Sequence, residues 1–82
     1  MSAPNRQQQQ VQNAAILKNM LIQETMSLYE MNDVLQYEFI KELVAKANGN
    51  QHDVDYMKEL MEKIRQTKLL IKECRDLLAE MP

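Results

Sequence analysis

The chain has 82 residues, of which 45% are hydrophobic and 27% charged, and its formal net charge is −2. A chain of this length buries only about 60% of the surface that its unfolded form exposes, so a self-sufficient core of the enzyme kind is not expected. The composition is typical of a globular chain, and the nearly balanced charge disfavours a dedicated nucleic-acid binder.

The sequence contains one Gly and two Pro, too few for the several tight turns that a sheet needs, so we expect an all-α chain. Residues 1–11 are polar and contain Pro4 and four consecutive Gln, which predicts a flexible tail. From about residue 12 to 47 there is no Gly or Pro, and residues that favour helices dominate. This segment predicts one long helix.

A turn over about residues 48–52 and a second helix over about residues 53–80 are expected next. The turn begins with Asn-Gly-Asn, residues that tolerate the left-handed backbone dihedrals by which helices end. Asn50 or Asp53 would cap the second helix. Because the connection is short, two helices that touch must run antiparallel. The predicted domain is thus a helical hairpin of residues 12–81.

Residues of the second predicted helix recur with alternating spacings of three and four, which is the heptad pattern of a coiled coil. This seam consists of Met57, Leu60, Ile64, Thr67, Ile71, Cys74, Leu78 and Met81. A less regular series in the first helix can pair with it, namely Leu17, Leu21, Glu24, Leu28, Met31, Leu35, Phe39 and Leu43. The predicted register sets Leu43 near Leu60 and Leu21 near Met81. We expect an antiparallel, coiled-coil-like two-helix hairpin whose long first helix overhangs the second.

The hairpin contact cannot cover every apolar residue of the first helix. A second stripe on nearly the opposite side consists of Ile22, Met26, Tyr29, Tyr37, Ile40 and Val44. The second helix is expected to end opposite Leu21, so Ile16, Leu17 and Met20 would have no neighbour within the hairpin. Leu69 lies outside the seam of the second helix. Two helices have no interior that could bury these residues, so we expect the hairpin to complete a multi-helix bundle with partner chains.

A row of basic residues follows one flank of the second seam and consists of Arg65, Lys68, Lys72 and Arg75. These charges would either be neutralised by the acidic first helix across the seam or bind an acidic site on a partner. Exposed ion pairs contribute only about 0–1 kcal/mol each, so the row is expected to select a partner and its orientation.

Side chains that could carry out catalysis are few. The one pair worth considering is Cys74 as a nucleophile with His52 as its base. A continuous helix would hold these two residues about 30 Å apart. Cys74 is therefore interpreted as a small hydrophobic residue of the seam. The hinge lacks Gly at the sixth position of a calcium loop, so its acidic residues predict helix capping and no metal site. We expect no enzyme activity, no cofactor and no small-molecule substrate.

Two further kinds of partner are disfavoured by the sequence. Basic residues interleaved with aromatic ones, which surfaces for single-stranded nucleic acid use, are absent. No run approaches the roughly 20 apolar residues that span a bilayer, and the first six residues do not resemble a secretory signal. We expect a cytoplasmic or nuclear protein.

Together these patterns predict a non-catalytic subunit or adaptor that contributes a helical hairpin to a larger protein complex. The expected partner-binding residues are Ile16, Leu17, Met20, Ile22, Met26, Tyr29, Tyr37, Ile40, Val44, Arg65, Lys68, Leu69, Lys72 and Arg75. The expected partners are other helical protein subunits, in a hetero-complex or a homo-oligomer. Two alternatives stay open: a self-assembling homodimeric four-helix bundle, and a small helical regulator that binds and inhibits an enzyme.

Overall fold

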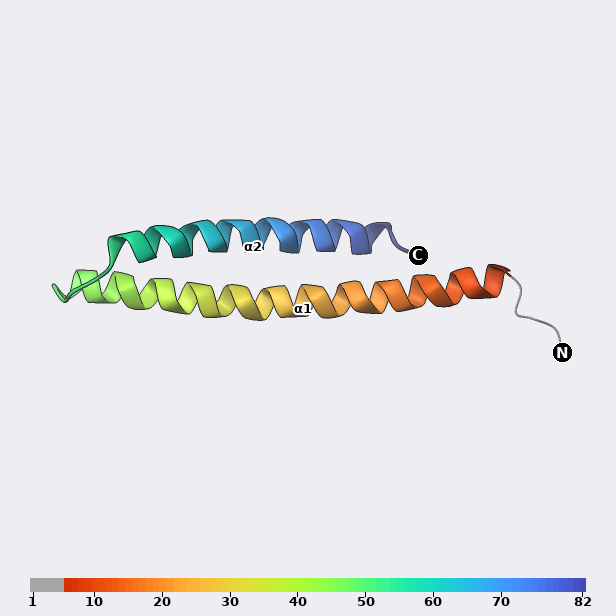
Figure 1. Cartoon of the computed structure of the whole chain (residues 1–82), viewed down its shortest axis with the longest axis horizontal. Coiled ribbons are helices and arrows are strands. Elements are labelled where there is room, and N and C mark those ends of the chain that lie inside the picture. Colours follow the sequence, from red (N-terminus) through yellow and green to blue (C-terminus); the bar gives the residue numbers. More distant parts are fainter. Residues whose placement is uncertain (1–5) are drawn as a thin grey trace.

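The computed structural model is an antiparallel hairpin of two long helices (Figure 1). It describes residues 6–82, with side chains from residue 12 onward. Helix α1 spans Arg6–Ala47 and helix α2 spans Val54–Glu80. The all-helical hairpin expected from the sequence is confirmed.

Helix α1 begins at Arg6, whereas the sequence analysis placed its start near residue 12. Gln enters helices at little cost, and no Gly or Pro occurs between Pro4 and Gly49 to stop the helix. The tail expected over residues 1–11 therefore overlaps with α1 from Arg6 onward. Its first five residues lie outside the described part of the chain.

The two helices differ in length, with 42 residues in α1 and 27 in α2. At about 1.5 Å per residue, α1 is longer by roughly 20 Å. Figure 1 shows the excess at the N-terminal end of α1, beyond the C-terminus of α2. The Nζ atom of Lys18 donates a hydrogen bond to the carbonyl oxygen of Pro82 at 3.3 Å, so the last residue of the chain, two residues after the end of α2, lies within reach of the Lys18 side chain.

The turn after α1 is closed by backbone hydrogen bonds typical of a Schellman motif. The amide of Asn50 donates to the carbonyl of Ala45 at 2.8 Å, and the amide of Gly49 donates to the carbonyl of Lys46 at 3.1 Å. Gly49 has a φ of 71°, a left-handed conformation that Gly adopts without steric cost. The position of this single Gly therefore decides where α1 ends.

Helix α2 starts with Asp53 as its N-cap. One carboxylate oxygen of Asp53 accepts a hydrogen bond from the amide of Tyr56 at 2.9 Å, which satisfies an amide that has no partner within the helix. The amide of Asp53 itself donates to Oε2 of Glu42 at 3.2 Å. A carboxylate of α1 thus ties the first residues of α2 to the hairpin.

The seam predicted for α2 is confirmed at every position. All eight residues of the series from Met57 to Met81 are buried or half-buried, and every other residue of α2 is exposed. Leu60 is the least exposed apolar residue of the core, at 2%. An unbroken heptad pattern in α2 therefore faces α1 along the whole helix.

The seam predicted for α1 is correct at only half of its positions. The regular series of buried and half-buried residues in α1 is Lys18, Leu21, Thr25, Leu28, Asn32, Leu35, Phe39 and Glu42. The predicted seam members Leu17, Glu24, Met31 and Leu43 are exposed instead. The predicted series changed its spacing at Phe39, whereas the observed series keeps the alternation of three and four that matches the unbroken heptad of α2. Leu43, which the predicted register set near Leu60, is exposed.

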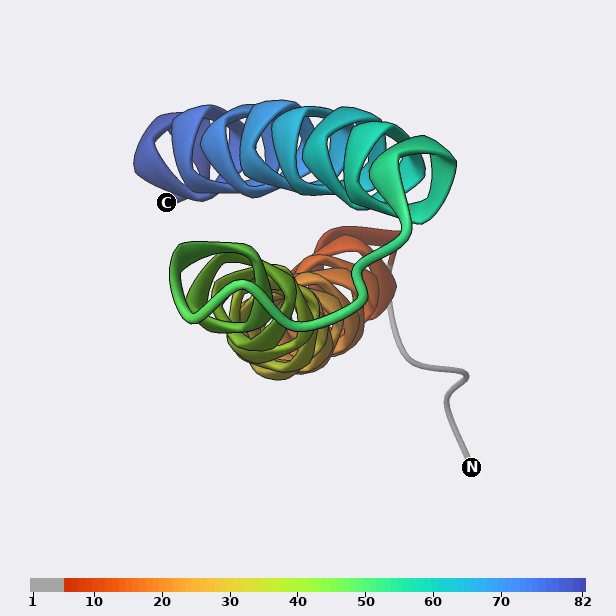
Figure 2. The ribbon, with the colours of Figure 1, turned by 90° about the vertical axis from the view of Figure 1, so that its left-hand side faces the viewer.

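The core of the hairpin contains as many polar as apolar side chains. The buried residues are Leu28, Leu60 and Ile71 together with Thr25, Asn32 and Thr67. The hydroxyl groups of Thr25 and Thr67 donate to the carbonyls of Leu21 and Lys63, each at 2.7 Å. The Oδ1 atom of Asn32 is buried without a hydrogen-bond partner. In the view along the hairpin, each helix meets the other on one side only (Figure 2), so the core is a narrow seam.

Candidate partner-binding surface

The residues predicted to bind a partner comprise the second stripe of α1, the first turns of α1, the basic row of α2, and Leu69 of α2, which lies outside the seam and the row. All fourteen of them are exposed, namely Ile16, Leu17, Met20, Ile22, Met26, Tyr29, Tyr37, Ile40, Val44, Arg65, Lys68, Leu69, Lys72 and Arg75. Their accessibility leaves each of them free to contact another chain.

The second stripe of α1 is positioned by the seam. Because Leu28 and Leu35 point toward α2, the stripe residues are rotated away from it and stay between 36% and 62% exposed. The sequence analysis placed Leu43 in the seam, but the structure adds it to the edge of this stripe, with 42% of its surface exposed. The stripe is thus an apolar band on α1 that α2 does not cover.

The stripe and the basic row of α2 meet in one groove, here called the basic groove. Its lining from α1 consists of Gln36, Phe39, Ile40 and Leu43, and its lining from α2 consists of Met61, Ile64, Arg65 and Lys68. A neighbouring hollow continues the groove along α2 and is lined by Lys68, Ile71, Lys72, Arg75, Asp76 and Ala79. The sequence analysis identified the stripe and the row separately. Only the fold shows that they border the same groove.

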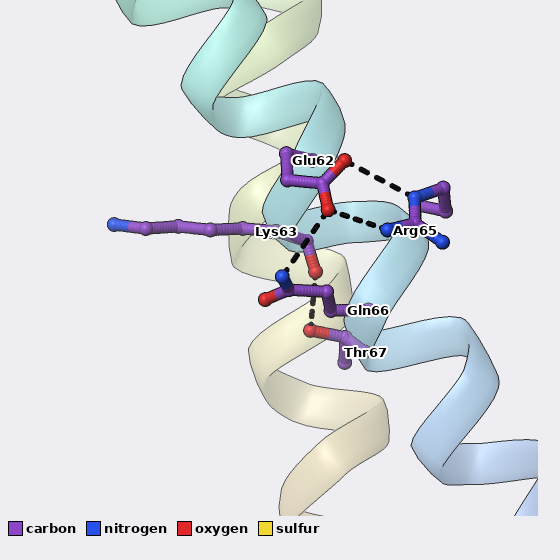
Figure 3. A network of polar contacts seen from close by, with 5 residues as sticks. All are labelled: Glu62, Lys63, Arg65, Gln66 and Thr67. Carbon is purple, nitrogen blue, oxygen red and sulfur yellow. Dashed lines mark hydrogen bonds and ion pairs between the residues drawn. The ribbon is translucent and has the colours of Figure 1, made fainter.

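The basic row is partly paired with carboxylates of its own helix. Arg65 donates through Nε to Glu62 at 3.1 Å, and Gln66 donates to the same carboxylate at 3.2 Å (Figure 3). The hydrogen bond from Arg65 is the main cause that holds the pKa of the Glu62 carboxyl below its usual value. Lys72 pairs with Asp76 at 3.0 Å.

No ion pair among the described residues joins α1 to α2. The four salt bridges all connect residues three or four positions apart on one helix. Lys68 and Arg75 have no carboxylate within ion-pair distance among these residues. The sequence allowed two interpretations of the basic row, and one was that acidic residues of α1 neutralise it across the seam. The hairpin has no such ion pairs among the described residues.

A second groove lies on the opposite edge of the hairpin, and the sequence analysis missed it. It is lined by Leu28, Met31, Leu35, Lys63, Gln66, Thr67 and Leu70. Met31, Leu70, Leu77 and Val34 are all about half exposed or more. Their helical spacing is a usable signal, but Met31 was predicted to be a seam residue. We call this the Met31 groove.

The first turns of α1 lie at the open end of the hairpin. Ile16 and Leu17 precede Lys18, whose side chain reaches the last residue of the chain, and more than half of the surface of each is exposed. Met20 is 61% exposed. These residues continue the exposed apolar surface of α1 toward its N-terminus.

The polar hinge uses its side chains for capping. Asp53 and Glu42 bind backbone amides, and Nδ1 of His52 lies 3.4 Å from the carbonyl oxygen of Asn50. Cys74 is a free thiol, half-buried in the seam. Within residues 6–82, no group of three or more His, Cys, Asp or Glu side chains is arranged to hold a metal ion.

In the described part of the chain, neither helix has a stretch long and apolar enough to cross a membrane. Comparisons with protein-family models, with curated proteins and with solved structures found no significant match to this chain.

Proposed function

We propose that this protein is a non-catalytic helical subunit that binds partner helices through its exposed apolar faces and completes a multi-helix assembly. The proposal rests on one observation. The hairpin buries three apolar side chains, while eighteen large apolar or aromatic side chains of the described residues stay exposed.

Such exposure is unusual for a chain that works alone. Soluble monomers rarely present contiguous apolar patches larger than a few hundred Å² unless the patch is a binding site. Here the exposed residues are not scattered, because they follow α1 along two sides and reach α2 at the margins of both grooves. Partner helices that pack in these grooves would supply the interior that two helices cannot form.

Substitution of the second stripe tests this proposal. Met26→Asp and Ile40→Asp place a charge on the stripe without touching the seam, so α-helical circular dichroism should be retained while partner binding is lost. Gln23→Asp is the matched control, because it adds the same charge at an exposed polar position of α1. The measurement is the amount of each stoichiometric partner that co-purifies with tagged full-length chain. Full recovery of the partners with both stripe variants would refute the proposal.

The same exposed faces would also be covered in a homodimeric four-helix bundle. Light scattering on the purified chain separates the two assemblies. A stable dimer or tetramer that melts cooperatively supports self-assembly, whereas a chain that aggregates alone and becomes soluble on co-expression with a partner supports the hetero-complex.

A further inference from the structure

The basic groove combines two kinds of recognition surface on its two sides. Apart from Gln36, the α1 side and the floor are apolar. They are formed by Phe39, Ile40 and Leu43 with Met61 and Ile64. The α2 side carries the basic row, which begins at Arg65 and continues along the neighbouring hollow to Arg75. An occupant that fits both sides must be apolar along one edge and negatively charged along the other.

The geometry of the basic row matches a helix as the occupant. Its four members are separated by three, four and three residues, so they form one ridge that extends about 15 Å along α2. A helix that lies along the groove presents side chains at the same heptad spacing. Carboxylates repeated at this spacing could meet successive cations of the row.

The row keeps positive charge available for such a partner. Arg65 and Lys72 each have one carboxylate neighbour, and both pairs are solvent-exposed contacts within α2. Lys68 and Arg75, the two members between and beyond them, have no ion-pair partner among the described residues. Four cations thus lie beside the groove, and two of them are paired with carboxylates of their own helix.

A second copy of this chain fits the groove less well than a separate acidic helix. The α2 helix of a copy would bring the same basic row. The α1 helix of a copy carries only Glu30 and Asp33 beside its second stripe, by helical spacing, so two carboxylates would face four cations.

We propose that the basic groove binds an amphipathic helix of a partner protein that carries a heptad-spaced row of Asp or Glu beside its apolar stripe. This inference rests on the proposed function and specifies the chemistry of one partner. The Met31 groove, which has no comparable row of cations, is left for other contacts. Complementary charge of this kind selects the partner and raises its association rate.

Two synthetic peptides test the proposal on the full-length chain. Both are three-heptad amphipathic helices with Leu and Ile at the seam positions, and they differ only in carrying Glu or Lys along one flank. The Glu peptide should bind at least tenfold more tightly than the Lys peptide, and its affinity should fall as NaCl is raised from low to high concentration. The measurement is fluorescence anisotropy of the labelled peptides.

A charge reversal in the chain completes the test. Lys68→Glu combined with Arg75→Glu should reverse the preference between the two peptides. Lys41→Glu combined with Lys63→Glu is the matched control with the same net charge, because neither residue lines the basic groove. The control variant should keep the preference for the Glu peptide.

Three results would overturn the proposal: equal binding of both peptides, no binding of either peptide, or a dimer of the chain that the Glu peptide does not dissociate. None of these results decides the proposed function, because stripe variants are tested on native partners. A native partner that is lost with Ile40→Asp but retained with the charge reversal would keep the proposed function and reject this inference.

Discussion

The two helices of the hairpin differ in the residues that they place in their shared seam. In α2, six of the eight seam residues are aliphatic or Met, and most of the remaining surface is charged. In α1, the seam includes Lys18, Thr25, Asn32 and Glu42, while twelve large apolar or aromatic residues are exposed. The contact with α1 explains the seam of α2, although six large apolar or aromatic residues of α2 also stay exposed. The contact with α2 leaves twice as many such residues of α1 exposed.

In the proposed assembly, this difference favours α1 as the more central helix. A helix that is apolar around much of its circumference is normally surrounded by other helices. Polar residues at the ends of its seam have identifiable roles in the hairpin, since Lys18 binds the last carbonyl of the chain and Glu42 binds the start of α2. The apolar residues on the other sides of α1 have no such role within one chain.

Truncation of one seam residue and of one stripe residue should give the largest difference in the free energy of unfolding. Leu60→Ala removes a buried side chain from the seam and should lower the free energy of unfolding of the purified chain by about 2–4 kcal/mol. Ile40→Ala, on the exposed stripe, should change it by no more than about 0.5 kcal/mol. Urea unfolding followed by circular dichroism measures both. Equal losses would show that Ile40 is already packed within a single hairpin.

Asn32 tests the cost of a polar residue in the α1 seam, because it is buried and its Oδ1 lacks a hydrogen-bond partner. Asn32→Leu should raise the free energy of unfolding by about 1–2 kcal/mol, since it removes the desolvation penalty of the amide. Asn19→Leu, at an exposed position of α1, is the control and should give no comparable gain. A loss of stability in Asn32→Leu would mean that the amide is satisfied in solution.

The turn should be sensitive to its single Gly. Gly49→Ala should lower the free energy of unfolding by about 1 kcal/mol, because the φ of 71° is strained for Ala. No atom lies within 4 Å of the added Cβ, so the loss would come from the backbone alone. Gly49→Asn should lose less, since Asn tolerates this conformation better than Ala. Equal losses for Ala and Asn would argue against a left-handed residue at this position.

The smallest expected effect concerns Glu62, at the border of the basic row. Its pKa in the folded chain lies below the ordinary value of 4.5, chiefly because Arg65 donates a hydrogen bond to it. The folded state thus binds a proton less readily than the unfolded state, and the contribution is present above pH 4.5 and lost as the pH falls through the folded-state pKa. Thermal melts between pH 6 and 3 should show a slightly smaller decline for Glu62→Gln than for the unaltered chain. An identical decline would mean that the pair with Arg65 does not persist in solution.

The fold could be predicted from the sequence where one periodicity was unambiguous. The eight seam residues of α2 stand out because charged residues separate them, and Gly49 marks the turn as a single breaker between two long segments. The predicted α1 seam failed at Glu24 and Met31 because α1 has apolar residues on several sides. The predicted and the observed series share Leu21, Leu28, Leu35 and Phe39. They differ between these positions, where the structure places Thr25 and Asn32 in the seam in place of Glu24 and Met31.

The candidate surface could be predicted in its parts but not in its arrangement. The stripe of α1 and the basic row of α2 are visible as separate helical patterns. Their shared groove depends on which side of α1 faces α2, and that follows from the seam that the sequence left ambiguous. Assigning Met31 to the seam hid the groove on the opposite edge in the same way.

Oxidative footprinting of methionines can show whether partner helices cover the second stripe, because Met26 lies on the exposed stripe and Met57 in the seam. The rates of oxidation are compared between the full-length chain alone and the same chain in the complex purified from cells. If partner helices cover the stripe, Met26 should react readily in the isolated chain and slowly in the complex, with little change at Met57. Equal reactivity of Met26 in both samples would contradict the account.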